Sequence, residues 1–209
     1  MISTPRTLLD ISGASRTETD LANAAVILID PQREYDTGVL RLSGMDAAVE
    51  GAGRLLDATR SAAIPVIHVL HHGRQGAAAF DPDRAFVQPI AGLEPRKAET
   101  VFIKGLPNGF AGTGLRDHLI SLGKTEVIVA GFATHMCVSS TVRAALDLGF
   151  ACTVVANATA TRDLWDPASN QVVPAAQVQA ANLAALADRF ARIVPDTAAL
   201  FRASAAIAR

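Results

Sequence analysis

The expected fold is decided by Val127-Ile128-Val129-Ala130-Gly131-Phe132-Ala133-Thr134-His135-Met136-Cys137-Val138-Ser139-Ser140-Thr141. Residues 127–130 form a short apolar run that is typical of a buried strand, and Gly131 breaks it. After Cys137 the apolar residues recur at every fourth position: Val138, Val142 and Leu146. This spacing predicts a helix over 137–148, so Cys137 is expected in the turn between a central strand and that helix.

A cysteine in this position is a candidate nucleophile. The unpaired N–H groups and the dipole of a helix start favour an anion, so the thiol of Cys137 is predicted to ionise more easily than a free thiol. The alternative is that Cys137 is a small buried hydrophobic residue, which is the usual role of a free cysteine.

Length and composition predict one intracellular domain. The chain has 209 residues, is 50% hydrophobic and has a formal net charge of −1, which fits a single α/β domain over 1–209. Basic runs, acidic tails, long apolar runs and a signal peptide are all missing from the sequence, so neither nucleic acid nor a membrane is an expected partner. The cysteines, Cys137 and Cys152, are too few for a disulfide framework and favour a cytoplasmic location.

Strand and helix patterns alternate along the whole chain. Strands are predicted at 24–30, 64–70, 100–104, 127–130, 151–156 and near 193–194, and helices at 45–62, 115–122, 137–148, after Pro174 and at the C-terminus. Residues 1–22 lack a period and are expected to form an N-terminal arm, whereas 72–98 should be a long functional or interface loop. The alternation predicts a three-layer αβα fold of the α/β class with a six-stranded, mostly parallel sheet.

Three reactive side chains follow three predicted strands. Asp30, Lys104 and Cys137 each come at or just after the carboxyl end of a strand, and in open α/β sheets these ends border the ligand crevice. Taken singly, Asp30 could form a turn with Pro31, and Lys104 could be solvated at a strand end. Together they make a chemical set, because a carboxylate can accept a thiol proton while a lysine stabilises both anions.

The sequence resembles the isochorismatase-like cysteine hydrolases, which include nicotinamidases and N-carbamoylsarcosine amidase. The resemblance covers about residues 22–195 and rests on three motifs: Ile29-Asp30-Pro31-Gln32, Lys104 with Asn108-Gly109-Phe110 and Thr113, and Gly131-Phe132-Ala133-Thr134-His135-Met136-Cys137-Val138 with Thr141. It implies an Asp30–Lys104–Cys137 catalytic triad, a cis peptide bond between Phe132 and Ala133, and an oxyanion hole made by the backbone N–H groups of Ala133 and Cys137. It also implies the strand order 3-2-1-4-5-6.

The function that this resemblance implies is hydrolysis of a C–N bond in a small amide or ureide through a thioester on the cysteine. The residues predicted to bind the substrate lie in the third motif or in loops at the crevice: Tyr35, Phe110, Thr134, His135 and Trp165. Packing is the alternative role of the aromatic residues. Members of the family commonly form dimers or tetramers, so a homodimer or homotetramer acting on a small-molecule substrate is expected.

Two departures from nicotinamidases bear on the substrate. The Asp-x-His stretch that helps those enzymes to hold a metal is missing from the sequence, and the adjacent His71 and His72 should face opposite ways at a strand end. No metal and no other cofactor is therefore expected, and these histidines are assigned to a crevice rim or a subunit contact. In addition, the first motif continues as Arg33-Glu34-Tyr35, where many relatives have Asn-Asp-Phe.

Two other functions stay open. One is a vinyl-ether hydrolase like the isochorismatases proper, whose chemistry needs no thiol. The other is a non-catalytic binding module on the same fold. The sequence lacks a Gly-x-Ser-x-Gly motif, which argues against a serine hydrolase.

Overall fold

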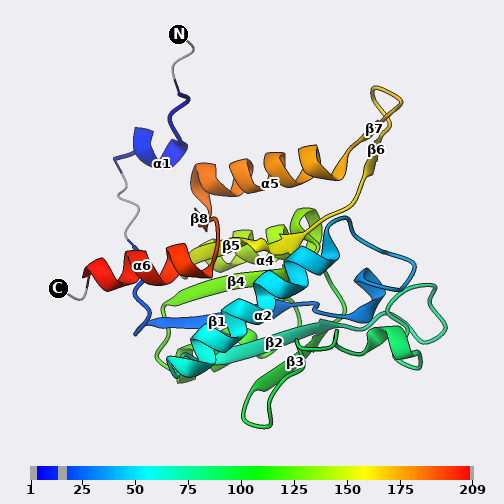
Figure 1. Ribbon diagram of the computed structural model, residues 1–209, viewed down its shortest axis with the longest axis horizontal. Helices are drawn as coiled ribbons and strands as arrows, with labels where there is room; N and C mark the ends of the chain where they lie inside the picture. The colour runs from blue at the N-terminus through cyan, green and yellow to red at the C-terminus, as the bar shows by residue number, and fades with distance from the viewer. Residues whose placement is uncertain (1–3, 14–17, 208–209) are drawn as a thin grey trace.

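The computed structural model describes residues 4–13 and 18–207 (Figure 1). Its centre is a parallel sheet with the strand order β3-β2-β1-β4-β5-β8. The strands of this sheet are β1 (Ala24–Ile29), β2 (Val66–His71), β3 (Thr100–Lys104), β4 (Glu126–Phe132), β5 (Ala151–Ala160) and β8 (Arg192–Val194). The predicted fold and strand order are confirmed, with β8 as the sixth strand of the sheet.

Helices cover both faces of the sheet (Figure 1). One face packs against α2 (Met45–Ser61) and α6 (Thr197–Ile207), and the other against α3 (Leu115–Ser121), α4 (Ser139–Asp147) and α5 (Ala175–Arg189). Strand β1 shows why its sequence is apolar throughout. Its side chains alternate between the two hydrophobic clusters and every one is fully buried, as expected for a central parallel strand.

The segment after β5 differs from the expected loop. It contains an antiparallel hairpin of β6 (Leu164–Asp166) and β7 (Gln171–Val173), in which Trp165 pairs with Val172. Figure 1 shows this hairpin projecting away from the sheet at the start of α5. Strand β5 is also longer than predicted, because it continues to Ala160.

The predicted N-terminal arm holds a short helix, α1 (Leu8–Ile11), within its described part. The backbone N–H of Leu8 donates to Asp188 Oδ1 on α5 at 2.8 Å. Residues 1–3 and 14–17 of the arm lie outside the described residues. None of the helices in the described part of the chain is long and apolar enough to cross a bilayer.

The long loop 72–98 packs onto the body of the protein. It contains the short helix η2 (Ala85–Val87), and its apolar side chains Phe80, Val87, Ile90 and Leu93 are buried. The carboxylate of Glu34, in the short helix η1 (Arg33–Tyr35), accepts hydrogen bonds from the backbone N–H groups of Val39 and Phe80, each at 2.9 Å. The first motif thereby fastens this loop beside the carboxyl ends of the strands.

Candidate active site

The structure brings Asp30, Lys104 and Cys137 together. Asp30 follows β1, Lys104 is the last residue of β3, and Cys137 lies in η3 (Thr134–Val138), a π-helical turn that follows β4. The ammonium Nζ of Lys104 donates to Asp30 Oδ2 at 2.8 Å and to Cys137 Sγ at 3.4 Å. All three side chains are buried, so these contacts form away from bulk water.

Two unusual backbone positions hold Asp30 in place. Asp30 itself has φ 45°, in the left-handed region that few non-glycine residues adopt, and its N–H donates to Val69 O on β2 at 2.7 Å. Gly131 on β4 has φ 115°, and a Cβ there would collide with the backbone of Ile29. Glycine at 131 therefore lets β4 approach β1 next to the carboxylate.

Burial sets the ionisation of the site. It raises the pKa of Asp30 to about 6, against the opposing charge and hydrogen bond of Lys104. Burial, and then the negative charge of Asp30, raise the pKa of Cys137 to about 12. The prediction that this thiol ionises more easily than a free one is therefore wrong, because desolvation outweighs the helix start and Lys104. At neutral pH the resting pair is a carboxylate and a thiol.

One oxygen of Asp30 is free to take the thiol proton. Lys104 occupies Oδ2, whereas Oδ1 is buried without a hydrogen-bond partner among the described residues. A carboxylate oxygen of Asp30 and Sγ of Cys137 lie within 4.8 Å of each other. A buried carboxylate oxygen that accepts no hydrogen bond, beside a buried thiol, is the arrangement that general-base catalysis requires.

The peptide bond between Phe132 and Ala133 is cis. The carbonyl oxygen of Ala133 accepts hydrogen bonds from the N–H groups of Met136 and Val138, at 3.0 and 3.2 Å, which fixes the start of η3. The N–H of Ala133 faces the hydroxyl of Tyr35, and this hydroxyl also faces the sulfur of Cys137. Burial, followed by the charges of Cys137 and Asp30, raises the pKa of Tyr35, so its phenol stays protonated and can donate.

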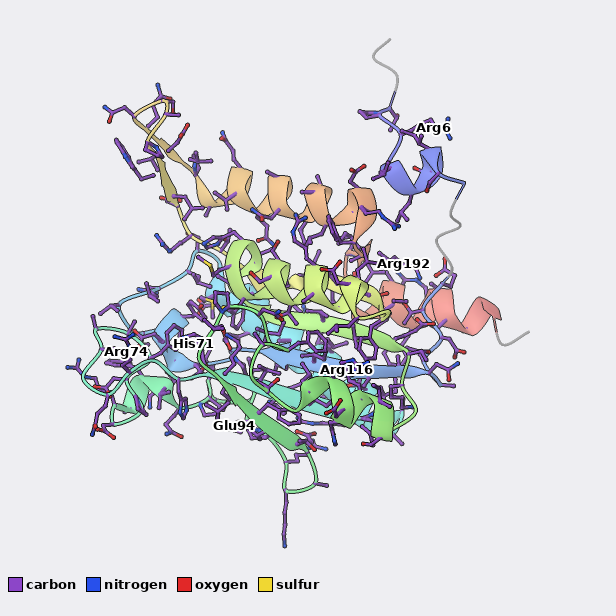
Figure 2. All side chains as sticks on the ribbon, turned by 180° about the vertical axis from the view of Figure 1, so that it is seen from behind. Arg6, His71, Arg74, Glu94, Arg116 and Arg192 are labelled. Carbon is purple, nitrogen blue, oxygen red and sulfur yellow. The ribbon has the colours of Figure 1, made fainter. Side chains whose placement is uncertain are left out.

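A cavity of about 170 Å³ opens above Cys137. It is lined by Tyr35, Leu40, His71, Phe80, Pro107, Ala133, His135, Met136, Cys137 and Arg162. Figure 2 shows the labelled His71 at the end of the sheet where the segments with η1 and η2 gather. The walls are mostly apolar, and the polar groups come from a few side chains, as in most small-molecule sites.

The predicted substrate-binding residues divide into two groups. Tyr35 and His135 line the cavity, and His135 Nδ1 is 2.6 Å from Thr161 Oγ1. Thr134 is buried and donates to Ala160 O at 3.0 Å, so its hydroxyl serves the backbone. Phe110 stacks on Phe150 with ring centroids 5.9 Å apart, in the cluster between the sheet and α3 and α4. The fifth, Trp165, is 59% exposed on the hairpin and is not among the residues that line the cavity.

Sequence reasoning did not assign Phe80 or Arg162 to the cavity wall, and it placed His71 only at a crevice rim or a subunit contact. Phe80 lies in a loop whose course depends on its hydrogen bond to Glu34, and Arg162 follows the strand β5, which is longer than predicted. His71 had a usable signal, because it is the last residue of β2 and shares the strand end with Asp30 and Lys104.

His71, Asp30 and Cys137 offer three potential metal-ligand atoms within 4.8 Å of one another. The same three side chains surround Lys104 Nζ, which lies 2.8 Å from Asp30 Oδ2, 3.0 Å from His71 Nδ1 and 3.4 Å from Cys137 Sγ. The lysine ammonium is thus the cation that this cluster holds.

The comparisons with known proteins agree with the motifs. The model of the isochorismatase domain matches residues 24–197. This chain belongs to the isochorismatase family. Members of the family with solved structures include an isochorismatase from Pseudomonas putida, which is 44% identical and superposes with a TM-score of 0.87 over 92% of this chain and 97% of the other.

Curated isochorismatase-family relatives differ in their roles. A secreted isochorismatase effector of Verticillium dahliae is 31% identical over 92% of this chain and 97% of its own. A streptothricin hydrolase of Streptomyces noursei is 34% identical over 84% of this chain and 69% of its own. This chain therefore belongs to a family of hydrolases. The cluster at Cys137 is its candidate active site.

Proposed function

We propose that this protein is a cysteine hydrolase that cleaves a C–N bond of a small amide or ureide through a thioester on Cys137. The observation that carries the proposal is the buried cluster in which Lys104 contacts both Asp30 Oδ2 and Cys137 Sγ, next to a mostly apolar cavity that Cys137 lines. The streptothricin hydrolase among the relatives supports hydrolysis as the reaction class.

In the proposed mechanism, Asp30 acts as the general base. Its free Oδ1 accepts the proton of the Cys137 thiol while Sγ attacks the carbonyl carbon, and Lys104 stabilises the sulfur as negative charge develops. The backbone N–H groups of Ala133 and Cys137 hold the tetrahedral oxyanion.

The same carboxyl group completes the cycle. Protonated Asp30 gives its proton to the departing nitrogen, so the C–N bond breaks and an acyl thioester remains on Cys137. Asp30 then takes a proton from a water molecule that attacks the carbonyl carbon of the thioester. As the C–S bond breaks, Asp30 returns this proton to the sulfur, so the carboxylic or carbamic acid leaves and the thiol and the carboxylate are restored.

Hydrolysis of a panel of small amides, carbamoyl compounds and lactams, followed by ammonia release or, for the lactams, by ring opening, tests this proposal. The wild-type protein is expected to release ammonia from at least one of them, and Cys137→Ala is expected to be folded but inactive. Cys152→Ala is the matched control, because Cys152 is buried next to Val142 and Phe150, away from the cavity. Hydrolysis that persists in a folded Cys137→Ala protein would refute the thioester, and consumption of isochorismate instead of amides would favour the vinyl-ether reaction.

Assembly and location belong to the same proposal. We expect a homodimer or homotetramer, which the exposed Trp165 and Val172 on the projecting hairpin support, and light scattering on a sizing column will measure the mass. A cytoplasmic location is supported by the free thiols of Cys137 and Cys152. Because one relative is secreted, cell fractionation is the direct measurement.

A further inference from the structure

We infer that His71 is a fourth functional residue of the site, which positions Lys104 through Nδ1 and offers Nε2–H to an oxygen atom of the bound substrate. The role of His71 in positioning Lys104, the positioning half of the inference, stands on the contacts alone. Its role as a donor to the substrate, the substrate half, rests on the proposed function. The cluster that the sequence motifs indicate contains an aspartate, a lysine and a cysteine, and it assigns no role to this histidine.

Three hydrogen-bond acceptors surround Lys104 Nζ. An ammonium group has three N–H bonds, and Lys104 Nζ has three neighbours that can accept them: Asp30 Oδ2 at 2.8 Å, His71 Nδ1 at 3.0 Å and Cys137 Sγ at 3.4 Å. His71 thus supplies the acceptor that completes this set. Without it, one N–H of a buried ammonium would lose its partner and the group could turn away from the sulfur.

The contact with Lys104 fixes the tautomer of His71. A lysine ammonium only donates, so the Nδ1 atom that faces it must carry a lone pair, and the proton of the neutral ring must sit on Nε2. Burial, and then the charge of Lys104, lower the pKa of His71 to about 4, so the ring is neutral at physiological pH. The lysine therefore determines which nitrogen of the histidine is a donor.

The second ring nitrogen of His71, Nε2, is not in contact with Lys104. His71 lines the cavity, and its ring packs edge-on against Phe80 with centroids 4.8 Å apart. Nε2 has no hydrogen-bond partner within the described part of the chain, and it is not among the polar atoms that are sealed from solvent there. The donor is thus open to whatever molecule occupies the cavity.

Hydrogen bonds to the backbone of His71 hold this donor in place. Gln32 holds the backbone of His71 from both sides: its Oε1 accepts from His71 N at 2.8 Å and its Nε2 donates to His71 O at 2.9 Å. Nε2 of Gln32 also donates to Val87 O at 2.8 Å, which ties the strand end to the loop 72–98. A donor fixed by ring packing and a backbone clamp loses little entropy on binding a carbonyl or carboxylate oxygen.

Histidine side-chain ¹⁵N NMR tests the positioning half without any substrate. With the His71 signals assigned by their loss in His71→Asn, the wild-type ring is expected to be the neutral Nε2–H tautomer from about pH 8 down to about pH 5. In Lys104→Met the ring is expected to titrate at a higher pH. An Nδ1–H tautomer, or an imidazolium at neutral pH in the wild type, would overturn the inference whether or not the protein hydrolyses amides.

The substrate half is tested with a tethered amide. Alkylation of Cys137 by iodoacetamide places a –CH₂–CONH₂ group in the cavity, and the His71 Nε2–H signal is expected to shift and to exchange more slowly with water. His71 signals that do not respond to this amide would contradict the donor role, even if amides prove not to be substrates.

Kinetics on an amide from the panel then separates the two nitrogen atoms. His71→Asn keeps an acceptor near the position of Nδ1 but has no donor at Nε2, so KM should rise about tenfold with kcat nearly unchanged. His71→Gln reaches toward Nε2 but leaves Lys104 without its acceptor, so kcat should fall instead. His72→Asn is the matched control, since His72 is absent from the cavity wall. Equal KM values for the wild type and His71→Asn would refute the donor role.

Discussion

Removal of Lys104 is expected to destabilise the protein by an amount that grows with pH. Lys104 and Asp30 form a fully buried ion pair, and Lys104→Met leaves the carboxylate without its counter-ion. Removing one partner of such a pair typically costs about 3–5 kcal/mol. The loss should be close to this range near pH 8, where the wild-type Asp30 is ionised.

The pH dependence follows from the pKa of Asp30. Its folded value of about 6 exceeds the ordinary aspartate value of 3.8, so the folded protein binds this proton more tightly than the unfolded chain and loses stability as pH rises from 3.8 to about 6. The wild type stops losing stability above about pH 6. In Lys104→Met the pKa of Asp30 rises further, so the free energy of unfolding of the variant keeps falling by about 1.4 kcal/mol per pH unit above about pH 6. By about pH 8 its difference from the wild type has therefore grown by about 3 kcal/mol.

Urea denaturation near pH 5.5 and near pH 8 measures the loss of unfolding free energy in Lys104→Met at each pH. The double variant Asp30→Asn/Lys104→Met has no buried charge at this position, so it should be more stable than Lys104→Met near pH 8 and should lack the pH dependence. Two outcomes would refute the reasoning: an equal loss for Lys104→Met at both pH values, or additive losses in the double variant.

Three further perturbations probe the site. As pH drops below about 6, log(kcat/KM) should fall with a slope of about one per pH unit, because Asp30 must be ionised to accept the thiol proton. A pH–rate profile on an active amide will measure this slope. Tyr35→Phe should lower kcat/KM by about 10- to 100-fold, since its hydroxyl faces both Cys137 and the Ala133 N–H; an unchanged value would assign Tyr35 to packing alone. Glu34→Ala should cost about 2–3 kcal/mol and expose the Phe80 amide to hydrogen exchange, because this buried carboxylate accepts hydrogen bonds from two backbone N–H groups; unchanged protection of that amide would contradict its role in fastening the loop.

The cluster was predictable from the sequence because it depends on strand ends. Parallel strands place their carboxyl ends on one edge, so residues just after apolar runs converge without any knowledge of loop geometry. That is why Asp30, Lys104 and Cys137 meet as expected. His71 ends β2 on the same edge and obeys the same rule, but its neighbour His72 made the pair look like a rim or a contact surface.

The rest of the site depends on long-range contacts that a local pattern does not contain. Phe110 lies in a loop after β3, as expected, yet its ring stacks on Phe150 forty positions away. The hairpin of β6 and β7 has three residues in each strand, too few for an alternating pattern to be recognised. Phe80 reaches the cavity because Glu34 binds its backbone, and nothing in a Gly- and Pro-rich loop predicts that hydrogen bond.

The raised pKa of Cys137 has a direct consequence for the proposed mechanism. At neutral pH the buried cluster holds a lysine ammonium, an Asp30 carboxylate, a neutral thiol and a neutral His71, so its net charge is zero. Transfer of the thiol proton to Asp30 Oδ1 converts this set into an ammonium and a thiolate, and the net charge remains zero. A permanent thiolate would instead add a second buried anion beside the Asp30 carboxylate, at a cost of several kcal/mol.

The nucleophile is therefore expected to form only during attack, when an electrophilic carbonyl carbon can take up the developing charge. This accounts for the position of Lys104 between the two acids. Its ammonium stabilises whichever of Asp30 and Cys137 is negative, so the cluster keeps one cation and one anion in contact throughout the proton transfer. His71 Nδ1, 3.0 Å from Lys104 Nζ, is the third acceptor around this ammonium, and we infer that it helps to hold the ammonium between the two acids.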